Sequence, residues 1–295
     1  MEKAKVYFTS DISPKGLVKI YNRLNKNLDG KVAIKISTGE LGGHNYLKPE
    51  LIKDLVQQLH GTIVECNTAY KGKRMSVDDH LETVKAHGFD KIANVDIMDS
   101  DGEMAIPVSN GKHLKENYVG KNLANYDSML MLSHFKGHAM GGYGGALKNM
   151  SIGVASSSGK AWIHTAGKTK NVNMLWSNLP EQNAFLESMA EACSGVVHYM
   201  NNNILYVNVM NNLSVDCDCD SNPEDPCMAD IGILSSIDPV ALDQACLDLI
   251  YNFTDRGRDH FVERVERQNG CYLPVYAEKI GLGSLQYELI NIDEE

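Results

Sequence analysis

The first half of the chain alternates short apolar runs with one-sided amphipathic segments. The runs AKVYFTS, KVAIKIST, TIVECN and SMLMLSH have the length and β-branched or apolar content of buried strands. Segments with apolar residues at helical spacing separate the first three of them. The strands expected here cover residues 4–10, 31–38, 62–67 and 128–134, and the helices cover 16–28, 48–59 and 77–88. This alternation predicts an α/β fold with a mostly parallel, doubly wound sheet flanked by helices.

The periodic pattern of apolar residues is weak from Phe135 to about Asn173 and becomes clear again beyond that stretch. The middle stretch is rich in Gly, Ser, Lys and His, and irregular stretches of this length in compact domains are usually functional. Beyond it we expect helices at 183–200, 239–253, 260–268 and 274–281 and strands at 204–212, 230–236 and 285–292. We expect a single domain over 1–295 with a smaller second lobe; the alternative is two α/β lobes, 1–175 with the Gly/His/Lys segment and 176–295 with the cysteine loop.

Composition narrows the functional classes. The formal net charge is −10 and no Lys/Arg-rich run offsets it, which disfavours binding to nucleic acid or anionic membranes. No apolar run approaches the roughly 20 residues of a membrane span, and MEKAKVYFTS lacks the pattern of a signal peptide. We therefore expect a cytoplasmic protein. Its 7 cysteines include three in one short loop, which in a reducing compartment suggests metal or redox chemistry.

The segment HFKGHAMGGYGGALKNMSIG carries the strongest signal for a site, because it follows directly on a strand of the predicted sheet. Glycines let the backbone approach a ligand, lysines supply charge or a nucleophilic amine, and histidines act as acid, base or metal ligand. The Walker and dinucleotide-binding spacings are absent. The alternative is a glycine-rich loop whose histidines bond only to the backbone. The candidates for catalysis are His138, Lys148 and His134, and those for cofactor contact are Gly141, Gly142, Gly144, Gly145, Lys136 and Lys148.

The loop SVDCDCDSNPEDPCMADIG places Cys217, Cys219 and Cys227 among acidic residues. Three thiolates can hold zinc or part of an iron–sulfur cluster, although this spacing matches no standard ferredoxin or zinc-finger pattern. The metal candidates are these three cysteines with His164, and Cys271 is a candidate for a fourth position. A calcium site built from the aspartates and a solvated turn remain as alternatives.

Two further segments follow strands at the same predicted edge of the sheet. ISTGELGGHNY follows the second strand, and the third strand is followed by Asn67, Lys71, Lys73 and Arg74. The cations suit an anionic group, and a solvated basic turn explains them equally well.

LSHFKGHAMGGYGGALKNMSIG, SVDCDCD and DIGILSSIDPVALDQAC resemble the family known as domain of unknown function 362, often labelled iron–sulfur centre proteins. The resemblance runs over essentially the whole chain. Members of that family often carry an added ferredoxin segment with C-x-x-C-x-x-C-x-x-x-C, which this chain lacks. The resemblance implies a metal or iron–sulfur cofactor and a ferredoxin-type redox partner.

A more distant similarity links the same segment to the nickel-pincer lactate racemases, whose pattern H-x-x-x-G-Y-x-G-x-x-K fits His138 to Lys148. The similarity implies that Lys148 tethers the cofactor, that His138 serves as acid or base and that His164 ligates nickel. The other catalytic histidine and the substrate arginine of that family have no match here.

The residues and resemblances together lead to three hypotheses. The first is a metal- or iron–sulfur-dependent enzyme, an oxidoreductase, acting on a small polar or anionic metabolite. The second is a non-catalytic iron–sulfur electron-transfer or cofactor carrier. The third is a racemase or isomerase of a 2-hydroxy acid that uses a lysine-tethered nickel cofactor. The metal, whether Fe, Ni or Zn, stays open.

Overall fold

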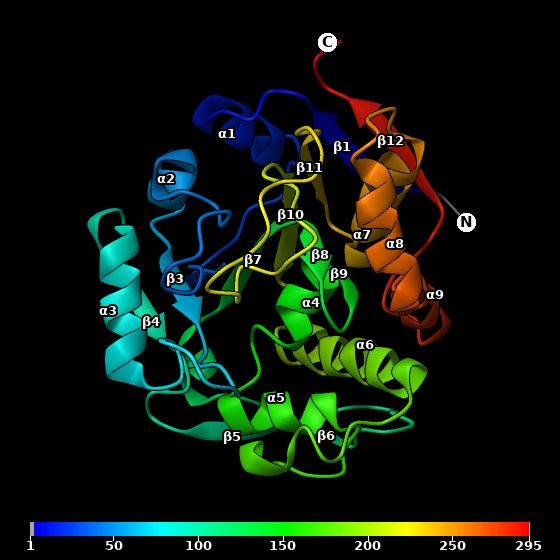
Figure 1. Cartoon of the computed structure of the whole chain (residues 1–295). Helices are drawn as coiled ribbons and strands as arrows, with labels where there is room; N and C mark the ends of the chain where they lie inside the picture. The colour runs from blue at the N-terminus through cyan, green and yellow to red at the C-terminus, as the bar shows by residue number, and fades with distance from the viewer. Residues whose placement is uncertain (1–2, 295) are drawn as a thin grey trace.

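The computed structural model describes residues 3–294, which form an eight-stranded sheet in the order β12-β1-β11-β10-β7-β2-β3-β4 (Figure 1). Neighbouring strands are parallel except β11, which is antiparallel to both β1 and β10. The predicted α/β fold with a mostly parallel sheet is confirmed. The strands are β1 (Ala4–Thr9), β2 (Val32–Lys35), β3 (Thr62–Glu65), β4 (Val95–Ile97), β7 (Ser128–His134), β10 (Ile204–Met210), β11 (Gly232–Ser236) and β12 (Tyr287–Asn291).

Helices cover both faces of this sheet, and the strand pattern shows why. In β7, Leu130 and Leu132 pack with α1, α2 and α3, whereas Met129 and Met131 point the other way, toward α4, α6 and α7. Alternate side chains of a strand point to opposite faces, so an unbroken apolar run is buried on both. The larger helices are α1 (Pro14–Asn22), α2 (Pro49–Gln58), α3 (Val77–His87), α6 (Gln182–Tyr199), α7 (Pro239–Asn252), α8 (Arg258–Arg267) and α9 (Tyr272–Lys279).

Helix boundaries follow local capping chemistry. The hydroxyls of Ser13 and Ser76 accept hydrogen bonds from the first turns of α1 and α3, and the Asp238 carboxylate does the same for α7. Gly88 ends α3 with a φ of +84°, a left-handed conformation that glycine adopts without steric cost. The predicted helix over 16–28 is shorter in the structure, because α1 already ends at Asn22.

The stretch after Phe135 is more ordered than its weak periodicity indicated. It folds as a small hairpin of β8 (Lys136–His138) and β9 (Gly142–Gly144), followed by α4 (Ala146–Ser151), α5 (Ser157–His164) and the short 3-10 helix η3 (Val172–Met174). A second hairpin, β5 (Glu103–Pro107) with β6 (Glu116–Gly120), lies beside α5. The remaining 3-10 helices are η1 (Phe89–Lys91) and η2 (Lys121–Asn125). These short elements were not expected from the sequence.

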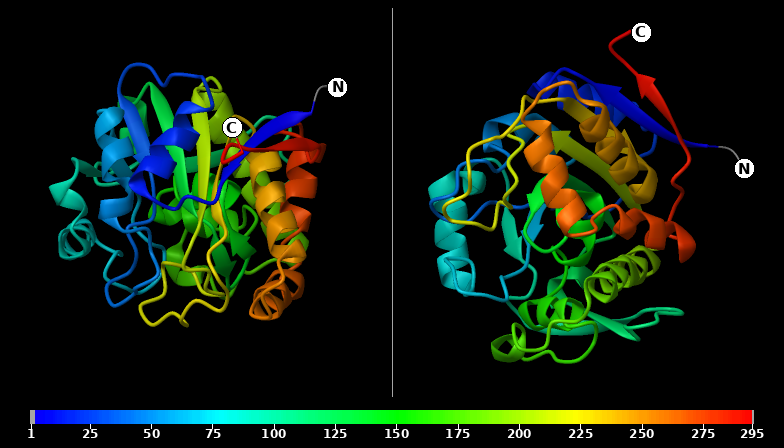
Figure 2. Two further views of the ribbon diagram at one scale, coloured as in Figure 1. Left: turned by 90° about the horizontal axis from the view of Figure 1, so that it is seen from above. Right: turned by 45° about the vertical axis from the view of Figure 1, so that its right-hand side comes forward.

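Both halves of the chain contribute to the same sheet. β1 pairs with β11 and β12, and β7 pairs with β10, so a boundary near residue 175 does not divide the strands. Figure 2 shows β1 and β12 side by side at one side of the molecule. The β5–β6 hairpin with α5 and α6 lies below the sheet in Figure 1 and forms a smaller layer there.

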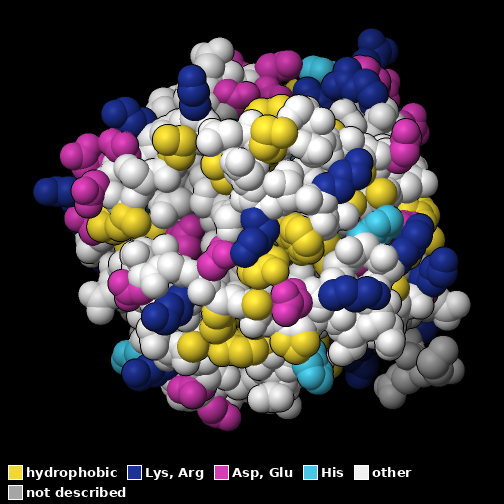
Figure 3. All heavy atoms as spheres, turned by 90° about the horizontal axis from the view of Figure 1, so that it is seen from below, with side chains coloured by type: hydrophobic (Ala, Val, Ile, Leu, Met, Phe, Trp, Pro, Cys, Tyr) yellow, Lys and Arg dark blue, Asp and Glu magenta, His cyan; other side chains and the backbone are white. Residues whose placement is uncertain are grey.

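The face below α5 mixes side chains of all kinds. Figure 3 shows Lys and Arg interspersed with Asp and Glu on this face, with hydrophobic side chains between them. No helix in the described part of the chain is long and apolar enough to cross a membrane.

Candidate functional site

The hairpin after β7 fixes the orientation of His138. Gly142, at the turn, has a φ of +80°, which favours glycine. The turn brings the backbone N–H of Gly141 to Nδ1 of His138, to which it donates a hydrogen bond at 2.8 Å. The N–H of Met140 donates to the same nitrogen at 3.3 Å. The buried His138 ring is thus held by the backbone of its own hairpin.

The glycine-rich segment and the cysteine loop meet at Lys148. Its amine donates a hydrogen bond to Sγ of Cys217 at 3.2 Å, although the two residues lie 69 positions apart. A hydrogen bond from Cys219, and then the charge of Lys148, hold the pKa of Cys217 well below its ordinary value in spite of burial. The same hydrogen bond, with burial, raises the pKa of Cys219 well above its ordinary value. One thiolate and one thiol therefore lie beside one ammonium group.

We refer to His138, Lys148, Cys217 and Cys219 as the thiol site. The ligand atoms of His138, Cys217 and Cys219 all lie within 4.8 Å of one another. Two sulfurs and an imidazole nitrogen are a donor set for zinc, nickel or iron. No fourth ligand-type side chain joins this group among residues 3–294. The geometry suits a single ion with an open coordination position and does not suit a four-cysteine cluster.

The hydrogen bonds of His138 limit its role. Because Nδ1 accepts from the backbone, the neutral ring carries its proton on Nε2. The ring also hydrogen bonds to Cys217, so Nε2 is the donor toward this thiolate. Burial, and then the charge of Lys148, lower the pKa of His138. A metal bond through Nε2 would require loss of the Gly141 contact, so this ring is better arranged as a proton donor than as a ligand.

His134 and Lys136 belong to a second cluster, the ion-pair cluster, centred on Asp218. Nδ1 of His134 lies 2.7 Å from the Asp218 carboxylate, and Nε2 donates to the carbonyl oxygen of Asn211 at 2.6 Å. The amine of Lys136 lies 2.9 Å from the other carboxylate oxygen and donates to the His134 carbonyl oxygen. Neither ring nitrogen of His134 is therefore free for catalysis, and the charge of Lys136 is already paired. This arrangement does not support the predicted catalytic role of His134 or the predicted cofactor role of Lys136.

Asp218 fixes the cysteine loop in place. Burial alone would raise the pKa of Asp218, but the charges of His134 and Lys136 outweigh it and hold the pKa at about 2. Its carbonyl oxygen accepts a hydrogen bond from the backbone of Glu40 at 2.7 Å. Since Asp218 stands between Cys217 and Cys219 in the chain, these bonds position both thiols.

The predicted cofactor-binding glycines mainly serve close packing. A Cβ at Gly145 would lie 2.5 Å from the Asp243 carboxylate, and one at Gly142 would lie 3.0 Å from Gly270. The first amides of α4 point at Asp243, which accepts hydrogen bonds from Ala146 and Leu147. The protein's own carboxylate thus takes the place that an anion would have there. Gly141 holds His138, and Gly144 lies against the Lys148 and Lys136 side chains.

His164 and Cys227 lie outside the group of three potential metal ligands. Nδ1 of His164 donates to the Lys160 carbonyl oxygen at 2.7 Å, its ring stacks on Phe185, and burial lowers its pKa to about 4. This leaves Nε2 of His164 as an acceptor, the tautomer that metal ligation requires. The Cys227 thiol donates to the carbonyl oxygen of Leu213. Cys271 lies outside the group as well and contacts the Tyr251 hydroxyl.

Two cavities adjoin the thiol site. The outer cavity, of about 640 Å³, is lined by His138, Cys217 and Cys219 and by the segments after β2 and β3, including Glu40, Tyr70, Lys71 and Lys73. The inner cavity, of about 50 Å³, is lined by Lys35, Lys148, Lys160, Tyr70 and Cys219, among others. Tyr70 hydrogen bonds to Cys219, and both residues line both cavities, so they form the wall between them.

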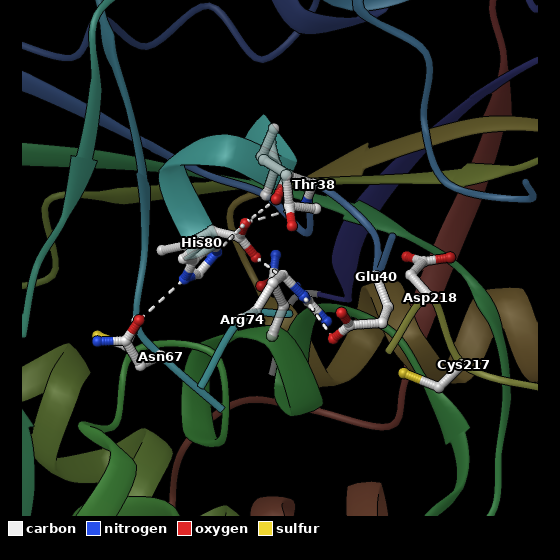
Figure 4. Close-up of polar contacts among 12 residues, drawn as sticks. Thr38, Glu40, Asn67, Arg74, His80, Cys217 and Asp218 are labelled. Atoms are coloured by element: carbon white, nitrogen blue, oxygen red, sulfur yellow. Dashed lines mark hydrogen bonds and ion pairs between the residues drawn. The ribbon is translucent and has the colours of Figure 1, made fainter. Parts of the chain in front are cut away.

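Tyr70 and Glu40 were not predicted as site residues. Both follow strands at the edge where the sequence places ligands, and that position was the only signal. Arg74, predicted as a candidate for anion binding, is buried instead between Glu65 and Glu40, at 3.1 and 3.5 Å. Figure 4 shows Arg74 pointing at Glu40, with His80 on one side and Cys217 and Asp218 on the other. This network anchors the segment after β3 against the cysteine loop.

Comparisons with known proteins give a family match and distant matches to solved structures. The model of the family described as domain of unknown function (DUF362) matches residues 32–248. The solved structures that match include the lactate racemase apoprotein from Thermoanaerobacterium thermosaccharolyticum, with 16% identity, a TM-score of 0.41, and coverage of 69% of this chain and 50% of that one. A protein from Thermotoga maritima matches with 10% identity, a TM-score of 0.38, and coverage of 89% and 58%.

The chain thus spans between half and three fifths of the length of these two solved structures. None of the curated proteins matches it. The family match covers well over half of the chain and includes the glycine-rich segment, the cysteine loop and most of α7. The chain therefore belongs to the DUF362 family.

Proposed function

We propose that this protein is a metal-dependent enzyme acting on a small polar or anionic molecule bound in the outer cavity. The observation that carries the proposal is the group His138, Cys217 and Cys219 at the wall of this cavity, with Lys148 hydrogen bonded to Cys217 behind it. Structural metal sites are closed by four protein ligands, whereas catalytic sites keep a position open. Cys217 and Cys219 supply fewer than four ligands, so a metal that they hold would fit the second description.

The thiols are the residues that would hold the metal, which would supply Lewis acidity or electron transfer at the open position. Lys148 neutralises the Cys217 thiolate in the structure. When both sulfurs are committed to a metal, the Lys148 ammonium loses that counter-charge and becomes available to an anionic ligand. His138, with its proton on Nε2, faces the same cavity and is placed to move a proton to or from the bound molecule.

Metal analysis of anaerobically purified protein tests this proposal. Wild type is expected to retain about one metal ion per chain, and Cys217→Ser and Cys219→Ser are expected to lose it. Cys227→Ser is the matched control, because this cysteine lies in the same loop and outside the ligand group. Sub-stoichiometric iron, nickel and zinc in wild type, or equal retention in all variants, contradicts the proposal. A Lys148→Ala variant that keeps its metal and still reduces a redox partner favours a carrier over an enzyme.

A second candidate is the isomerase with a lysine-tethered nickel cofactor. It is favoured by the two histidine tautomers: His138 presents an N–H, and His164 presents a free Nε2. Lys148 lies close enough to both rings for its charge to lower their pKa values. Intact mass spectrometry is expected to show an adduct on Lys148, and a 2-hydroxy acid is expected to exchange its α-hydrogen with solvent deuterium. An unmodified mass and no exchange across a panel of 2-hydroxy acids exclude this candidate.

A further inference from the structure

Cationic side chains outnumber carboxylates at the wall of the inner cavity. Five cationic side chains line it, together with a single carboxylate, that of Glu65. Arg74 is paired with Glu65, and Lys136 is paired with Asp218. Lys148 faces the Cys217 thiolate. The two lysines that remain, Lys35 and Lys160, do not belong to the thiol site or to the ion-pair cluster.

Lys35 and Lys160 are buried and contact only neutral acceptors. Their exposed fractions are 2% and 5%. The Lys35 amine donates to the Ile36 carbonyl oxygen at 2.5 Å and to Oδ1 of Asn149 at 3.0 Å. The Lys160 amine donates to the carbonyl oxygens of Ala155 and Cys66 at 2.6 and 3.5 Å. Within residues 3–294, no carboxylate lies within 4 Å of either amine.

This arrangement leaves one N–H of each amine without a protein acceptor. A protonated lysine has three N–H groups, and each of these amines uses two of them on the protein. Burial lowers the pKa of Lys35 to about 7 and also lowers the pKa of Lys160. The charges of Glu65 and, for Lys160, Asp99 act on these amines only from beyond ion-pair distance. Buried amines without an ion-pair partner in contact are costly for a protein to keep. An anion between them would supply the missing counter-charge and accept the remaining N–H groups.

We propose that the inner cavity binds a tetrahedral oxyanion, phosphate, held by Lys35, Lys148 and Lys160. The three amines come from three different elements, β2, α4 and α5, and all line one space of about 50 Å³. A water needs roughly 10–15 Å³ of such space, so the cavity has room for a few waters or for one small oxyanion.

Separate ammonium groups act as point charges and suit phosphate, whereas the planar carboxylate is matched best by a guanidinium group. Among residues 3–294, one guanidinium group lines this cavity, that of Arg74, and it is committed to Glu65 and Glu40. The phosphate is either a free ion or the phosphoryl end of a larger ligand that passes the wall of Tyr70 and Cys219. The proposal does not require a metal at the thiol site, so its failure and that of the proposed function are separate results.

Calorimetric titration with inorganic phosphate tests the site in protein dialysed against a phosphate-free buffer. We expect saturable binding by wild type, weakened at least about tenfold by Lys35→Met and by Lys160→Met, since each change removes a charge-assisted hydrogen bond to a buried anion. Methionine keeps the length and volume of the side chain without its charge. Lys53→Met, on the exposed face of α2, is the matched control and should bind as wild type does.

A parallel titration with glycerol 3-phosphate distinguishes the two sources of the oxyanion. If glycerol 3-phosphate competes with inorganic phosphate, the site accepts the phosphoryl group of a larger ligand. If glycerol 3-phosphate does not compete, the site takes the free ion. No binding of either probe to wild type overturns the proposal, and so does undiminished binding by folded Lys35→Met and Lys160→Met.

If neither lysine variant folds, hydrogen–deuterium exchange of the wild-type protein, measured with and without phosphate, tests the proposal instead. Phosphate is expected to protect the end of β2 and the α4–α5 segment from exchange. Protection elsewhere, or none, overturns the proposal.

Discussion

Asp218 and Cys217 are neighbours in the chain, yet they belong to two different clusters at the same edge of the sheet. The ion-pair cluster around Asp218 satisfies both ring nitrogens of His134 and the charge of Lys136. The thiol site around Cys217 contains the same kinds of group, a histidine and a lysine, but it opens onto the outer cavity.

The difference shows that residue type alone does not identify a functional group. A histidine whose two nitrogens meet protein acceptors has nothing left for a substrate, whereas His138 keeps an N–H directed at the thiols. The ion-pair cluster holds Asp218 in place and thereby positions the two thiols on either side of it. Changes in the ion-pair cluster should alter stability, and changes in the thiol site should alter ligand binding.

Removing the centre of the ion-pair cluster should have the largest effect on stability. Asp218→Asn leaves His134 and Lys136 without their counter-charge in a buried setting, which typically costs about 3–5 kcal/mol. Chemical denaturation measures the change. Asp225→Asn, in the same loop, removes an exposed pair with His44 and should cost less than about 1 kcal/mol. Equal costs for the two variants would mean that the buried cluster gives no special support.

The same carboxylate should control stability in acid. The folded pKa of Asp218, about 2, lies below its ordinary value of 3.8, so its contribution is fully present above about pH 4 and is lost as the pH falls through 2. This difference in the pKa of Asp218 between the folded and unfolded states corresponds to about 2 kcal/mol of unfolding free energy. The gap in unfolding free energy between wild type and Asp218→Asn should therefore narrow between pH 4 and pH 2. A gap that does not change with pH contradicts this assignment.

Substitution by alanine should distinguish a glycine in tight contact with its neighbours, Gly145, from one that borders flexible side chains, Gly144. Gly145→Ala pushes a methyl group onto Asp243 and Phe135 and should cost about 1–3 kcal/mol of stability. Gly144→Ala meets only the flexible Lys148 and Lys136 side chains at 3.4 and 3.6 Å and should change stability little. Thermal unfolding of both variants checks this. Similar melting temperatures would indicate that α4 does not depend on close contact with Asp243.

One change should raise the stability of the protein by a small amount. Without a bound anion, Lys35→Met removes a buried amine and should stabilise the protein by about 1 kcal/mol near pH 7. Between pH 7 and 10.5 the unfolded chain binds more protons at Lys35 than the folded one, so wild type becomes more stable as the pH rises. The advantage of the variant should shrink over that range in denaturation curves. A loss of stability at pH 7 would make Lys35 a structural residue.

The sequence predicted the parts of this molecule that its local pattern determines. β7 and β10 are continuous apolar runs, and their burial on both faces follows from that pattern. The antiparallel placement of β11 and the glycine-rich β8–β9 hairpin depend on tertiary contacts that no local pattern records. For such short strands, pairing partners decide the structure more than intrinsic preference does.

The candidate site was predictable in its location and less so in its roles. Lys148 and Cys217 meet as the positions of their segments indicated. His134, in contrast, is satisfied by a carboxylate 84 residues away, and nothing near it in the sequence shows that partner. Tyr70 reaches Cys219 in the same way from a loop without a recognisable motif. Distinguishing a satisfied group from an available one requires the partners in three dimensions.

Titration of the metal-free protein with Co²⁺ under anaerobic conditions tests the central claim most directly, because thiolate ligands give a charge-transfer absorption band on this ion. The band should appear in wild type and in Cys227→Ser and should be lost in Cys217→Ser and Cys219→Ser. A wild-type protein without the band, or four proteins with the same band, would contradict the assignment of Cys217 and Cys219 as the metal-holding pair.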